Sequence, residues 1–531
     1  MDRASTPLRR TRGWGLAALL GTAGCGDDAP PPAVEGSSGE NSTTTTAEPP
    51  DDSSTGVATT AVDSGSSDEG LPPLEVEVSI YTYPTQPMVI DLGFSAPELT
   101  LSVEHLSDEG VRADPIAGAE GESWMRVRGL SPSTGHILRW SAEDAAGRTD
   151  AGDLLVRTEG ALPGFVPSFP IEGTGLGYGG YVMFDLLALT PRAPASLFVV
   201  DPDGITRWHI GRIDESPGPN AVFAGVEQRP DGTLLFLRNY SIFIIDELGA
   251  ERLSITSEQA GLPGMHHDVI ELDSGNLLTL SYTFRDIEYP DIGLTHVAGD
   301  LIVELTPEGD VVWEWDAFDH LDPQRRRAGF EELIFDPDRL VTASDWTHGN
   351  GLVHDPATDT VLFSSRHQDW LVLIDRATGD VLWRLGEEGD FGLEPGGLWP
   401  YHQHSPQWQD DGSLLLYDNG LGNPTLPDVF ETSRAVRYAL DTETMMATEV
   451  WEDEADDFIS IIAGDADRLP DGSILVTDSA IDFEVGPDQS YARIREIDED
   501  DSATPQWSFT TALGTFVYRC IPTALLPGQV P

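Results

Sequence analysis

Hydrophobic and polar residues alternate along much of the chain from residue 74 onward. Residues 74–78 read Leu-Glu-Val-Glu-Val, and the same period of two returns at 99–103, 125–130 and 138–140. A period of two turns alternate side chains towards a core and towards water, which is typical of half-buried β-strands. The sequence therefore predicts a small β-sandwich over 74–160.

The end of this segment carries a short resemblance to a known domain. Residues 129–132, which read Gly-Leu-Ser-Pro, and the turn at 145–149 resemble the last strands of a fibronectin type III domain. Nothing in the segment is arranged for chemistry. We therefore expect a fibronectin-III-like β-sandwich that serves packing or positioning.

From about residue 175 two units alternate along the chain. The first unit is an apolar strand, a turn of the Asp-x-x-Gly type and a strand that ends in Trp, and it occurs at 197–208, 301–313, 370–383, 436–451 and 494–507. The second unit is Asp-Gly or an equivalent followed by an apolar strand, and it occurs at 231–235, 274–278, 358–362, 411–415 and 471–475.

These repeats predict the architecture of the rest of the chain. Short turns that contain Asn, Asp or Gly suit hairpins, because these residues tolerate positive φ. Repeats of about 40 to 60 residues, each long enough for about four strands, favour a β-propeller. We count about six such repeats. The predicted fold class is all-β: a six-bladed β-propeller over 161–531, preceded by the small sandwich. A β-helix is the competing architecture, but its repeat is shorter.

The amino terminus is predicted to be a targeting signal that does not belong to the folded domains. Three arginines between 9 and 12 precede an apolar stretch, 13–23, which is too short to cross a bilayer. The stretch ends in Thr-Ala-Gly-Cys, which resembles a bacterial lipobox with Cys25 as the lipid attachment residue. We expect a lipoprotein signal peptide over 1–25. An ordinary secretory signal with a chance Cys is the alternative.

A segment of low complexity follows the predicted signal peptide. Residues 26–73 are mainly Ser, Thr, Pro, Gly and acidic residues, with almost no large apolar side chain. Such a composition cannot bury a core, so this segment is predicted to be a disordered linker. The lipid anchor and the linker together predict a protein that is tethered to a membrane and faces the periplasm or the cell exterior.

Composition narrows the possible functions. The chain has 30 Lys and Arg against 91 Asp and Glu, a net charge of −61, so it would repel nucleic acid and anionic lipid. All 30 cations are Arg, and the absence of Lys excludes a Walker A loop and pyridoxal phosphate chemistry. The two cysteines, Cys25 and Cys520, are too few for a cysteine zinc cluster or an iron–sulfur site. We expect no cofactor.

Histidines gather in the middle of the repeats. Nine of the 12 His lie between 266 and 404, and several share one phase of the repeat. The same phase in successive blades of a propeller maps to one ring around the central channel. A lone His is more often structural than functional, but the shared phase of His266, His267, His348 and His404 favours one common site.

Arg366 follows a predicted blade strand within the same region. Its planar guanidinium gives paired hydrogen bonds and suits a tetrahedral oxyanion. An ion pair with one of the many carboxylates is the alternative.

Four motifs in this region resemble a known family. The first reads Met-His-His-Asp-Val at 265–269 with Gly-Asn-Leu-Leu at 275–278, and the second reads Asp-Trp-Thr-His-Gly-Asn at 345–350. The third reads Ser-Ser-Arg-His-Gln at 364–368, followed by Ile-Asp-Arg at 374–376 and Trp-Arg-Leu-Gly at 383–386. The fourth reads Gln-His-Ser-Pro at 403–406 with Leu-Leu-Tyr-Asp-Asn-Gly at 415–420. In this order and phase they resemble the bacterial arylsulfate sulfotransferases of the arylsulfotransferase family, over about 175–531. No single motif is specific enough alone.

The resemblance implies a function and a site. It implies a six-bladed propeller that moves a sulfuryl group from a phenolic sulfate ester to another phenol, without the nucleotide donor PAPS. It implies His404 as the nucleophile, which forms a sulfohistidine intermediate. The residues implied around the sulfate are His348, Asn350, Arg366 and one of His266 and His267. Which of the paired histidines points inward stays open.

Two other functions are kept as alternatives. A metal-dependent hydrolase on the same fold is one, because neutral His also binds zinc. No clear set of carboxylate partners stands at this phase, although Asp268 is a candidate. A non-catalytic surface binding propeller is the other. We favour the transferase, with an aryl sulfate donor and a phenolic acceptor as partners and no metal. We expect the protein to contact the membrane only through the lipid anchor and to bind no nucleic acid. Whether it forms a homodimer stays open.

Overall fold

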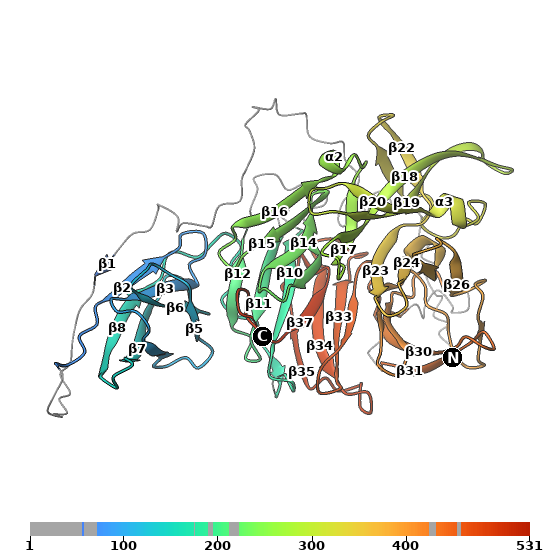
Figure 1. Cartoon of the computed structure of the whole chain (residues 1–531). Coiled ribbons are helices and arrows are strands. Elements are labelled where there is room, and N and C mark those ends of the chain that lie inside the picture. Colours follow the sequence, from blue (N-terminus) through green and yellow to red (C-terminus); the bar gives the residue numbers. More distant parts are fainter. Residues whose placement is uncertain are drawn as a thin grey trace, which may run out of the picture.

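A computed structural model describes residues 72–174, 176–189, 195–211, 222–423, 432–453 and 458–530, and the backbone of 56–57. Strands account for 51% of the structure and helices for 3%, which confirms the all-β class. Figure 1 shows a small body, drawn in blue, beside a large body that runs from green to red. The predicted signal peptide with its Cys25 and most of the predicted linker lie outside the described residues.

The small body is a sandwich of two antiparallel sheets. One sheet has the order β1 (Gly56–Val57), β2 (Val78–Thr82), β3 (Val89–Phe94), β6 (Ser123–Arg128) and β5 (Arg112–Ile116). The other has the order β4 (Thr100–His105), β7 (Gly135–Glu143) and β8 (Thr149–Arg157). Apart from β1, this is the strand order of an immunoglobulin constant-type sandwich.

Alternation in the sequence matches burial in the sandwich. Along β7 exposed and buried residues alternate without a break. The buried set of β7 includes Trp140, whose ring meets the ring of Phe94 from the opposite sheet edge-on at 5.6 Å between centroids. The period of two therefore identified the core side of this strand.

We call the large body the repeat region. Its described residues form six sheets between residues 172 and 523. The first sheet is β10 (Tyr181–Ala188), β11 (Ser196–Val200) and β12 (Thr206–Ile210), with β36 (Thr515–Phe516) and β37 (Cys520–Thr523) both paired to β10. The second is β13 (Ala224–Gln228), β14 (Leu234–Arg238), β15 (Ser241–Ile245) and β16 (Glu251–Thr256). The third is β17 (Met265–Glu271), β18 (Leu277–Tyr289), β19 (Gly293–Leu305) and β20 (Val311–Asp316), joined by a hairpin of β21 (Leu333–Asp336) and β22 (Val341–Asp345).

The remaining three sheets follow in chain order. The fourth is β23 (Gly349–Asp355), β24 (Thr360–Ser365), β25 (Trp370–Asp375) and β26 (Val381–Leu385). The fifth is β28 (His404–Trp408), β29 (Leu414–Asp418), β30 (Arg434–Asp441) and β31 (Met446–Glu452), edged by β27 (Gly392–Leu393). The sixth is β32 (Asp465–Arg468), β33 (Ile474–Ile481), β34 (Tyr491–Ile497) and β35 (Trp507–Thr510), edged by β9 (Glu172–Gly173).

In the described part of the chain three single-turn helices sit between these strands. They are α2 (Ser257–Ala260), α3 (Ala317–His320) and η1 (Arg366–Gln368). Among the described residues no helix has the length and the apolar character that a membrane span requires.

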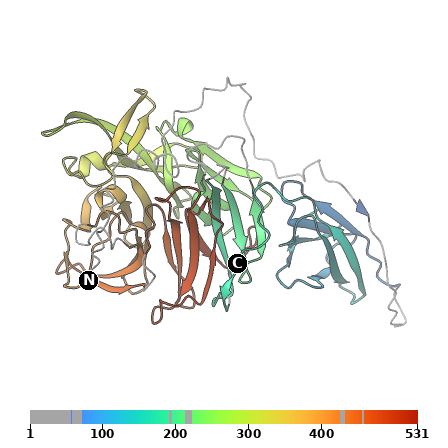
Figure 2. The same ribbon diagram turned by 180° about the vertical axis from the view of Figure 1, so that it is seen from behind.

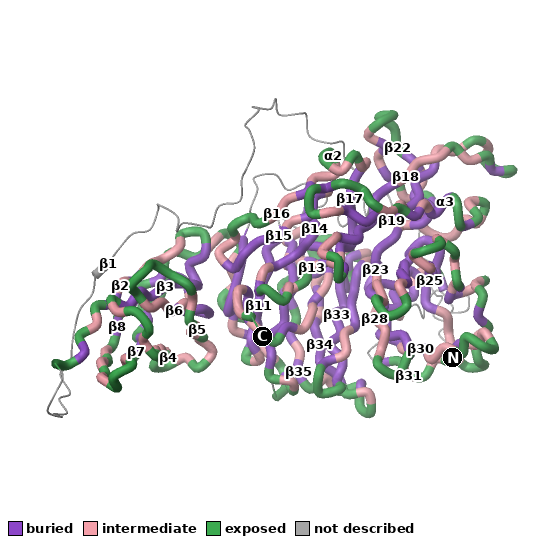
Figure 3. Tube along the Cα trace, viewed as in Figure 1, coloured by how far each residue is buried: buried purple, intermediate pink, exposed green. Residues whose placement is uncertain are grey.

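The first strands of the sheets lie side by side around one cavity. β17 contacts β13 and β23, and β28 contacts β23 and β32. A cavity of about 230 Å³ is lined by residues of β10, β13, β17, β23, β28, β32 and β37, so all six sheets contribute to it. Figure 3 shows these inner strands largely buried and the turns at the periphery exposed.

Four of the five repeated Trp residues join one sheet to the next. Each of the four donates a hydrogen bond from its indole nitrogen to a backbone carbonyl in the turn before the outermost strand of the following sheet, at 2.8 to 3.1 Å. The donor and acceptor pairs are Trp208 with Glu247, Trp313 with Arg376, Trp451 with Glu499 and Trp507 with Pro202. The last pair links the sixth sheet to the first, so the Trp pattern in the sequence marks contacts between sheets.

The sandwich is fixed to the repeat region by buried ion pairs. Arg126 and Arg128 both bind Glu247 of the β15–β16 turn, at 2.5 and 3.2 Å. Arg207 of β12 binds Asp108 of the sandwich at 2.8 Å. Figures 1 and 2 both show the sandwich beside the first two sheets, on the side away from the fourth and fifth.

Candidate functional site

The predicted site residues come from equivalent places in three neighbouring sheets. His266 and His267 lie in β17, Asn350 in β23 and His404 in β28, each in the first strand of its sheet. His348 precedes β23. These strands lie next to one another in the order β17, β23, β28.

A bulge in the backbone presents these side chains. The strand pairing shifts between His266 and Val269 in β17, next to Asn350 in β23, and between His404 and Gln407 in β28. A bulge leaves a residue without a pairing partner and re-aims its side chain, which is why bulges often border functional sites. The same device therefore aims polar side chains in all three sheets.

His404 is held in one tautomer by Asn419. The Asn419 amide nitrogen donates to the carbonyls of Ser460 and Ala463, at 2.7 and 2.8 Å. Its amide oxygen lies 2.6 Å from Nδ1 of His404 and must accept, so Nδ1 carries the proton. Nε2 of the neutral ring then keeps its lone pair.

Electrostatics keeps His404 uncharged. Burial lowers the pKa of this imidazole well below its ordinary value, and the positive charges of Arg366 and Arg519 lower it further. A neutral imidazole with a free lone pair is a nucleophile at neutral pH.

The paired histidines occupy different places. The His267 ring lies 4.8 Å from that of His348 between centroids, whereas the His266 ring stacks on Tyr282 at 4.0 Å. Their Nδ1 atoms are 2.8 Å apart, so one donates to the other. Burial lowers the pKa of His266 to about 3 and that of His267 well below its ordinary value. His267 therefore lies towards the other predicted residues, with His266 behind it.

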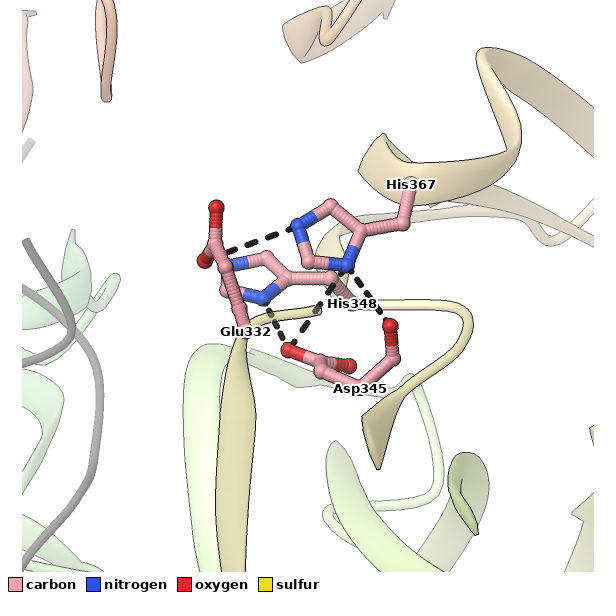
Figure 4. Close-up of side chains that lie close together, drawn as sticks. All are labelled: Glu332, Asp345, His348 and His367. Atoms are coloured by element: carbon pink, nitrogen blue, oxygen red, sulfur yellow. Dashed lines mark hydrogen bonds and ion pairs between the residues drawn. The ribbon is translucent and has the colours of Figure 1, made fainter. Parts of the chain in front are cut away.

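His348 belongs to a cluster that the sequence did not identify. Its Nδ1 lies 2.5 Å from a carboxylate oxygen of Asp345. Its ring lies 4.4 Å from the ring of His367, and Nε2 of His367 lies 3.6 Å from the carboxylate of Glu332. Figure 4 shows both imidazoles between Glu332 on one side and Asp345 on the other. We call these four residues the Glu332 cluster.

The carboxylates of the Glu332 cluster are stabilised as anions. Burial raises the pKa of Glu332, but the charges of Arg366 and His367 outweigh it and hold the pKa well below its ordinary value. Burial also raises the pKa of Asp345, but the interactions with His348 and His367 outweigh it, so the pKa lies below its ordinary value. Burial lowers the pKa of His348, against the opposing effect of Asp345.

Arg366 lies at the edge of this cluster. One of its terminal nitrogens, Nη1, lies 2.6 Å from Nε2 of His367 and 3.4 Å from Glu332. The other, Nη2, donates to the carbonyl of Ile461 at 3.3 Å, and its Nε has no partner among the described residues. The ion pair with a carboxylate that the sequence left as an alternative is therefore present.

Asn350 and Arg519 complete the polar surface. The Asn350 amide nitrogen donates to the carbonyl of Gln403 at 2.8 Å, and its oxygen has no partner among the described residues. Arg519, just before β37, donates to the Asn350 carbonyl at 2.8 Å and pairs with Asp268 at 3.3 Å. Asp268, the metal-ligand candidate of the sequence, is thus engaged with an arginine.

Sequence reasoning gave no role to Arg519, to Asn419 or to three of the four residues of the Glu332 cluster, Glu332, Asp345 and His367. Arg519 lies just before the closing strand β37, outside the repeat phase, and Glu332 lies just before the extra hairpin of the third sheet. Asn419 follows β29, and its place after a recurring strand was a usable signal. Two arginines beside a neutral imidazole suit a small, singly charged anion.

Comparisons with known proteins point in one direction. Residues 181–519 match the arylsulfotransferase (ASST) family. The chain is 25% identical over 391 residues to the arylsulfate sulfotransferase AssT of Lelliottia amnigena, covering 60% of this chain and 62% of that protein. It is 25% identical over 335 residues to the protein of the same name from Escherichia coli, covering 51% of this chain and 54% of that protein. The chain thus spans a little over half the length of these curated relatives.

Solved structures are more distant. Hydrazine synthase of Kuenenia stuttgartiensis has 12% identity and a TM-score of 0.30, covering 55% of this chain and 67% of that chain. Dihydro-heme d1 dehydrogenase has 11% identity and a TM-score of 0.31, covering 67% of this chain and 77% of that chain. Similarity at this level supports no argument about the site.

Proposed function

This chain belongs to the arylsulfotransferase family, through residues 181–519, and on that premise we propose that it transfers a sulfuryl group from a phenolic sulfate ester to another phenol. The observation that carries the proposal is the His404–Asn419 pair, which leaves a neutral imidazole with a free Nε2 beside two arginines. An aryl sulfate is a monoanion with a good leaving group, so it needs a neutral nucleophile and cationic donors. No nucleotide sulfate donor is required in this scheme.

We propose that the six sheets are the blades of a closed six-bladed propeller. The pairing of β37 with β10 supports closure, because it joins the last strand of the region to its first sheet. The hydrogen bond from Trp507 to Pro202 supports it independently, since it spans the sixth and first sheets. In such a ring the bulged first strands surround the channel, and the site lies at its opening.

In the first half-reaction Nε2 of His404 attacks sulfur. The nitrogen–sulfur bond forms as the bond from sulfur to the phenolic oxygen breaks, and the donor leaves as a phenolate. The product on the enzyme is sulfohistidine 404. Asn419 stabilises this step, because its oxygen accepts the Nδ1 hydrogen of a ring that becomes more positive.

Donors around the sulfuryl group stabilise the transition state. The charge of Arg366 acts on His404, the Asn350 amide bonds to the residue before His404, and the ring of His267 lies against that of His348, which supports these three residues as donors. Arg519 adds a second cation that sequence reasoning did not include. Preorganised donors of this kind act most strongly in a buried site with little water.

In the second half-reaction a phenol takes the group from sulfohistidine. The phenolic oxygen attacks sulfur, the nitrogen–sulfur bond breaks, and a base removes the phenolic proton. His348 suits this role, because Asp345 accepts its Nδ1 hydrogen and leaves the Nε2 lone pair free. The resulting imidazolium is stabilised by the Asp345 carboxylate and then releases its proton to water.

We also propose that the protein is held at a membrane by a lipid on Cys25 and faces the periplasm or the cell exterior. The lipobox-like residues 22–25 and the polar segment after them support this placement. Replacing Cys25 with Ser should move the protein from the membrane fraction to the soluble fraction after cell lysis. A Cys25→Ser variant that stays membrane-bound would reject the anchor.

The activity has a direct test. The purified chain is incubated with a chromogenic aryl sulfate, with and without a phenol, and without any nucleotide. Release of the chromogenic phenol that rises with acceptor concentration, and a sulfated acceptor in the products, is the expected result. A binding protein would release none, and a hydrolase would give free sulfate regardless of the acceptor.

A further inference from the structure

The Glu332 cluster has the composition of a transition-metal site. Glu332, Asp345, His348 and His367 each offer one nitrogen or oxygen within 4.8 Å of the others. Imidazole nitrogen together with carboxylate oxygen suits Zn²⁺ and the neighbouring first-row divalent ions. Glu332 and His348 are half-buried, whereas Asp345 and His367 are fully buried, so the cluster is held firmly but can be reached.

Hydrogen bonds orient two lone pairs away from Asp345. Nδ1 of His348 lies 2.5 Å from the Asp345 carboxylate, and Nδ1 of His367 lies 3.0 Å from the Asp345 carbonyl. Both oxygens can only accept, so both Nδ1 atoms carry the hydrogen. Nε2 of His367 lies 2.6 Å from Nη1 of Arg366, which can only donate, so this nitrogen carries a lone pair, as Nε2 of a neutral His348 ring does. A carboxylate behind a ligating imidazole is the usual arrangement around protein-bound zinc.

Glu332 stands across from Asp345, on the Nε2 side of His367. Its carboxylate lies 3.6 Å from Nε2 of His367, and Figure 4 shows the two imidazoles between the two acids. Ligand atoms about 2.0 to 2.2 Å from one tetrahedral ion lie about 3.3 to 3.6 Å from each other, so this separation needs little adjustment.

A cation already occupies this position. Nη1 of Arg366 lies 2.6 Å from Nε2 of His367 and 3.4 Å from the Glu332 carboxylate. The guanidinium thus stands where a metal ion would bind, and the two carboxylates of the cluster suit a cation of higher charge at this place.

We propose that Nε2 of His348, Nε2 of His367 and the carboxylate of Glu332 bind one Zn²⁺ or similar divalent ion in place of the Arg366 guanidinium, and that the bound ion blocks sulfuryl transfer. The block rests on the proposed function. The ion takes the lone pair with which His348 would accept the phenolic proton. It also displaces Arg366 from Glu332 and His367, and so from its position beside the donor sulfate.

Metal binding is tested on the full chain after treatment with a chelator and dialysis. Titration with Co²⁺ should give one equivalent of bound ion with the intense visible absorption of a four-coordinate site, and Zn²⁺ should displace it. His367→Gln and Glu332→Gln should each weaken Co²⁺ binding by at least about tenfold. The control His354→Gln removes a histidine that pairs with Asp359 at the surface, and should leave the affinity unchanged.

Arg366→Ala sharpens the test, because it should tighten Co²⁺ binding by removing the competing cation. A merely structural cluster would not respond in this direction. Glu332→Gln replaces one carboxylate oxygen by an amide nitrogen in a half-buried side chain. It can therefore test the site even if the His367→Gln variant does not fold. Absence of saturable Co²⁺ binding, or equal affinity in the wild type, Glu332→Gln and His354→Gln, overturns the site.

Inhibition is measured as sulfuryl labelling of the enzyme by an aryl sulfate, with and without one equivalent of Zn²⁺. We expect Zn²⁺ to slow labelling by about a hundred- to a thousandfold, as loss of Arg366 does, and excess chelator to restore the rate. Labelling that is unchanged by bound Zn²⁺ overturns the inhibitory role. If the chelated enzyme is never labelled, the proposed function fails, and the Co²⁺ titration still decides whether the metal site exists.

Discussion

The first strands of the second and fifth sheets carry the same backbone irregularity, but only the fifth carries a nucleophile candidate. Pairing shifts between Ala224 and Glu227 in β13, and between His404 and Gln407 in β28. The second residue of each bulge has positive φ, 57° at Gly225 and 49° at Ser405. The bulge is thus a property of the repeat, and the chemistry depends on which side chains it carries.

The two bulges differ in the side chains that they carry. Ala224 stands in β13 where β28 has His404, whose buried imidazole is hydrogen-bonded to Asn419. At the next position a Cβ atom on Gly225 would lie 2.5 Å from the backbone nitrogen of Val269 in the neighbouring sheet, whereas Ser405 carries a hydroxyl that donates to the carbonyl of Gly464. Close packing against β17 thus restricts the bulge of β13 to small residues, while the bulge of β28 carries a reactive side chain.

The largest effect is expected when the bulge of β28 loses its imidazole and so resembles the bulge of β13. His404→Ala removes the only group we assign to the covalent step, so turnover of an aryl sulfate should fall by at least about a thousandfold. Steady-state release of the chromogenic phenol measures it. His354→Ala, which changes a half-buried histidine that pairs with Asp359, is the matched control and should keep full activity. Substantial turnover by His404→Ala would reject the nucleophile.

Arg366→Ala should have the next largest effect. Loss of one preorganised donor to a developing anion typically costs about a hundred- to a thousandfold in rate. The loss should appear in kcat/KM for the donor, while slow labelling of His404 continues because the nucleophile is intact. An unchanged kcat/KM would show that Arg366 serves only the Glu332 ion pair.

The pH dependence gives a smaller effect with a definite sign. Burial and nearby arginines lower the pKa of His404, so the neutral, nucleophilic form persists as the pH falls. The rate of enzyme labelling in a single turnover should therefore stay flat through about pH 6.5, the ordinary pKa of histidine, and fall only at lower pH. A rate that halves near pH 6.5 would mean that the imidazole is not shielded as described.

The smallest effect concerns the contacts between sheets. Trp507→Phe removes the hydrogen bond from the sixth sheet to Pro202 of the first and leaves a carbonyl without its donor. We expect a loss of about 1 to 2 kcal/mol in the free energy of unfolding, measured by urea titration, with little change in activity. If Trp208→Phe loses the same free energy of unfolding, the hydrogen bond between the sixth and first sheets contributes no more than the equivalent bonds between other sheets.

Local patterns explain what the sequence could predict. The strands, the hairpin turns and the Trp contacts follow from periods and turn residues within a few positions of each other. The histidines and Arg366 were selected by their repeat phase and by resemblance, and they lie on neighbouring strands or next to them. A strict period of two would place His266 and His267 on opposite faces, whereas the bulge in β17 leaves both buried, so their roles could not be separated in advance.

Groups outside the repeat could not be predicted in this way. Glu332 is brought to His367 by the hairpin that joins the third sheet through a parallel pairing of β19 with β22. Arg519 reaches Asn350 because the carboxyl-terminal strand returns to the first sheet. Both contacts depend on tertiary closure, which leaves no local pattern in the chain.

The most direct test of the account is mass spectrometry of the chelator-treated enzyme after brief exposure to an aryl sulfate without acceptor. The account predicts one sulfuryl group per chain, labile in acid, on the peptide that contains His404. It also predicts loss of the group when a phenol is added, and no label in His404→Ala. A label on another residue, or acceptor-dependent turnover with no label on His404, would contradict it.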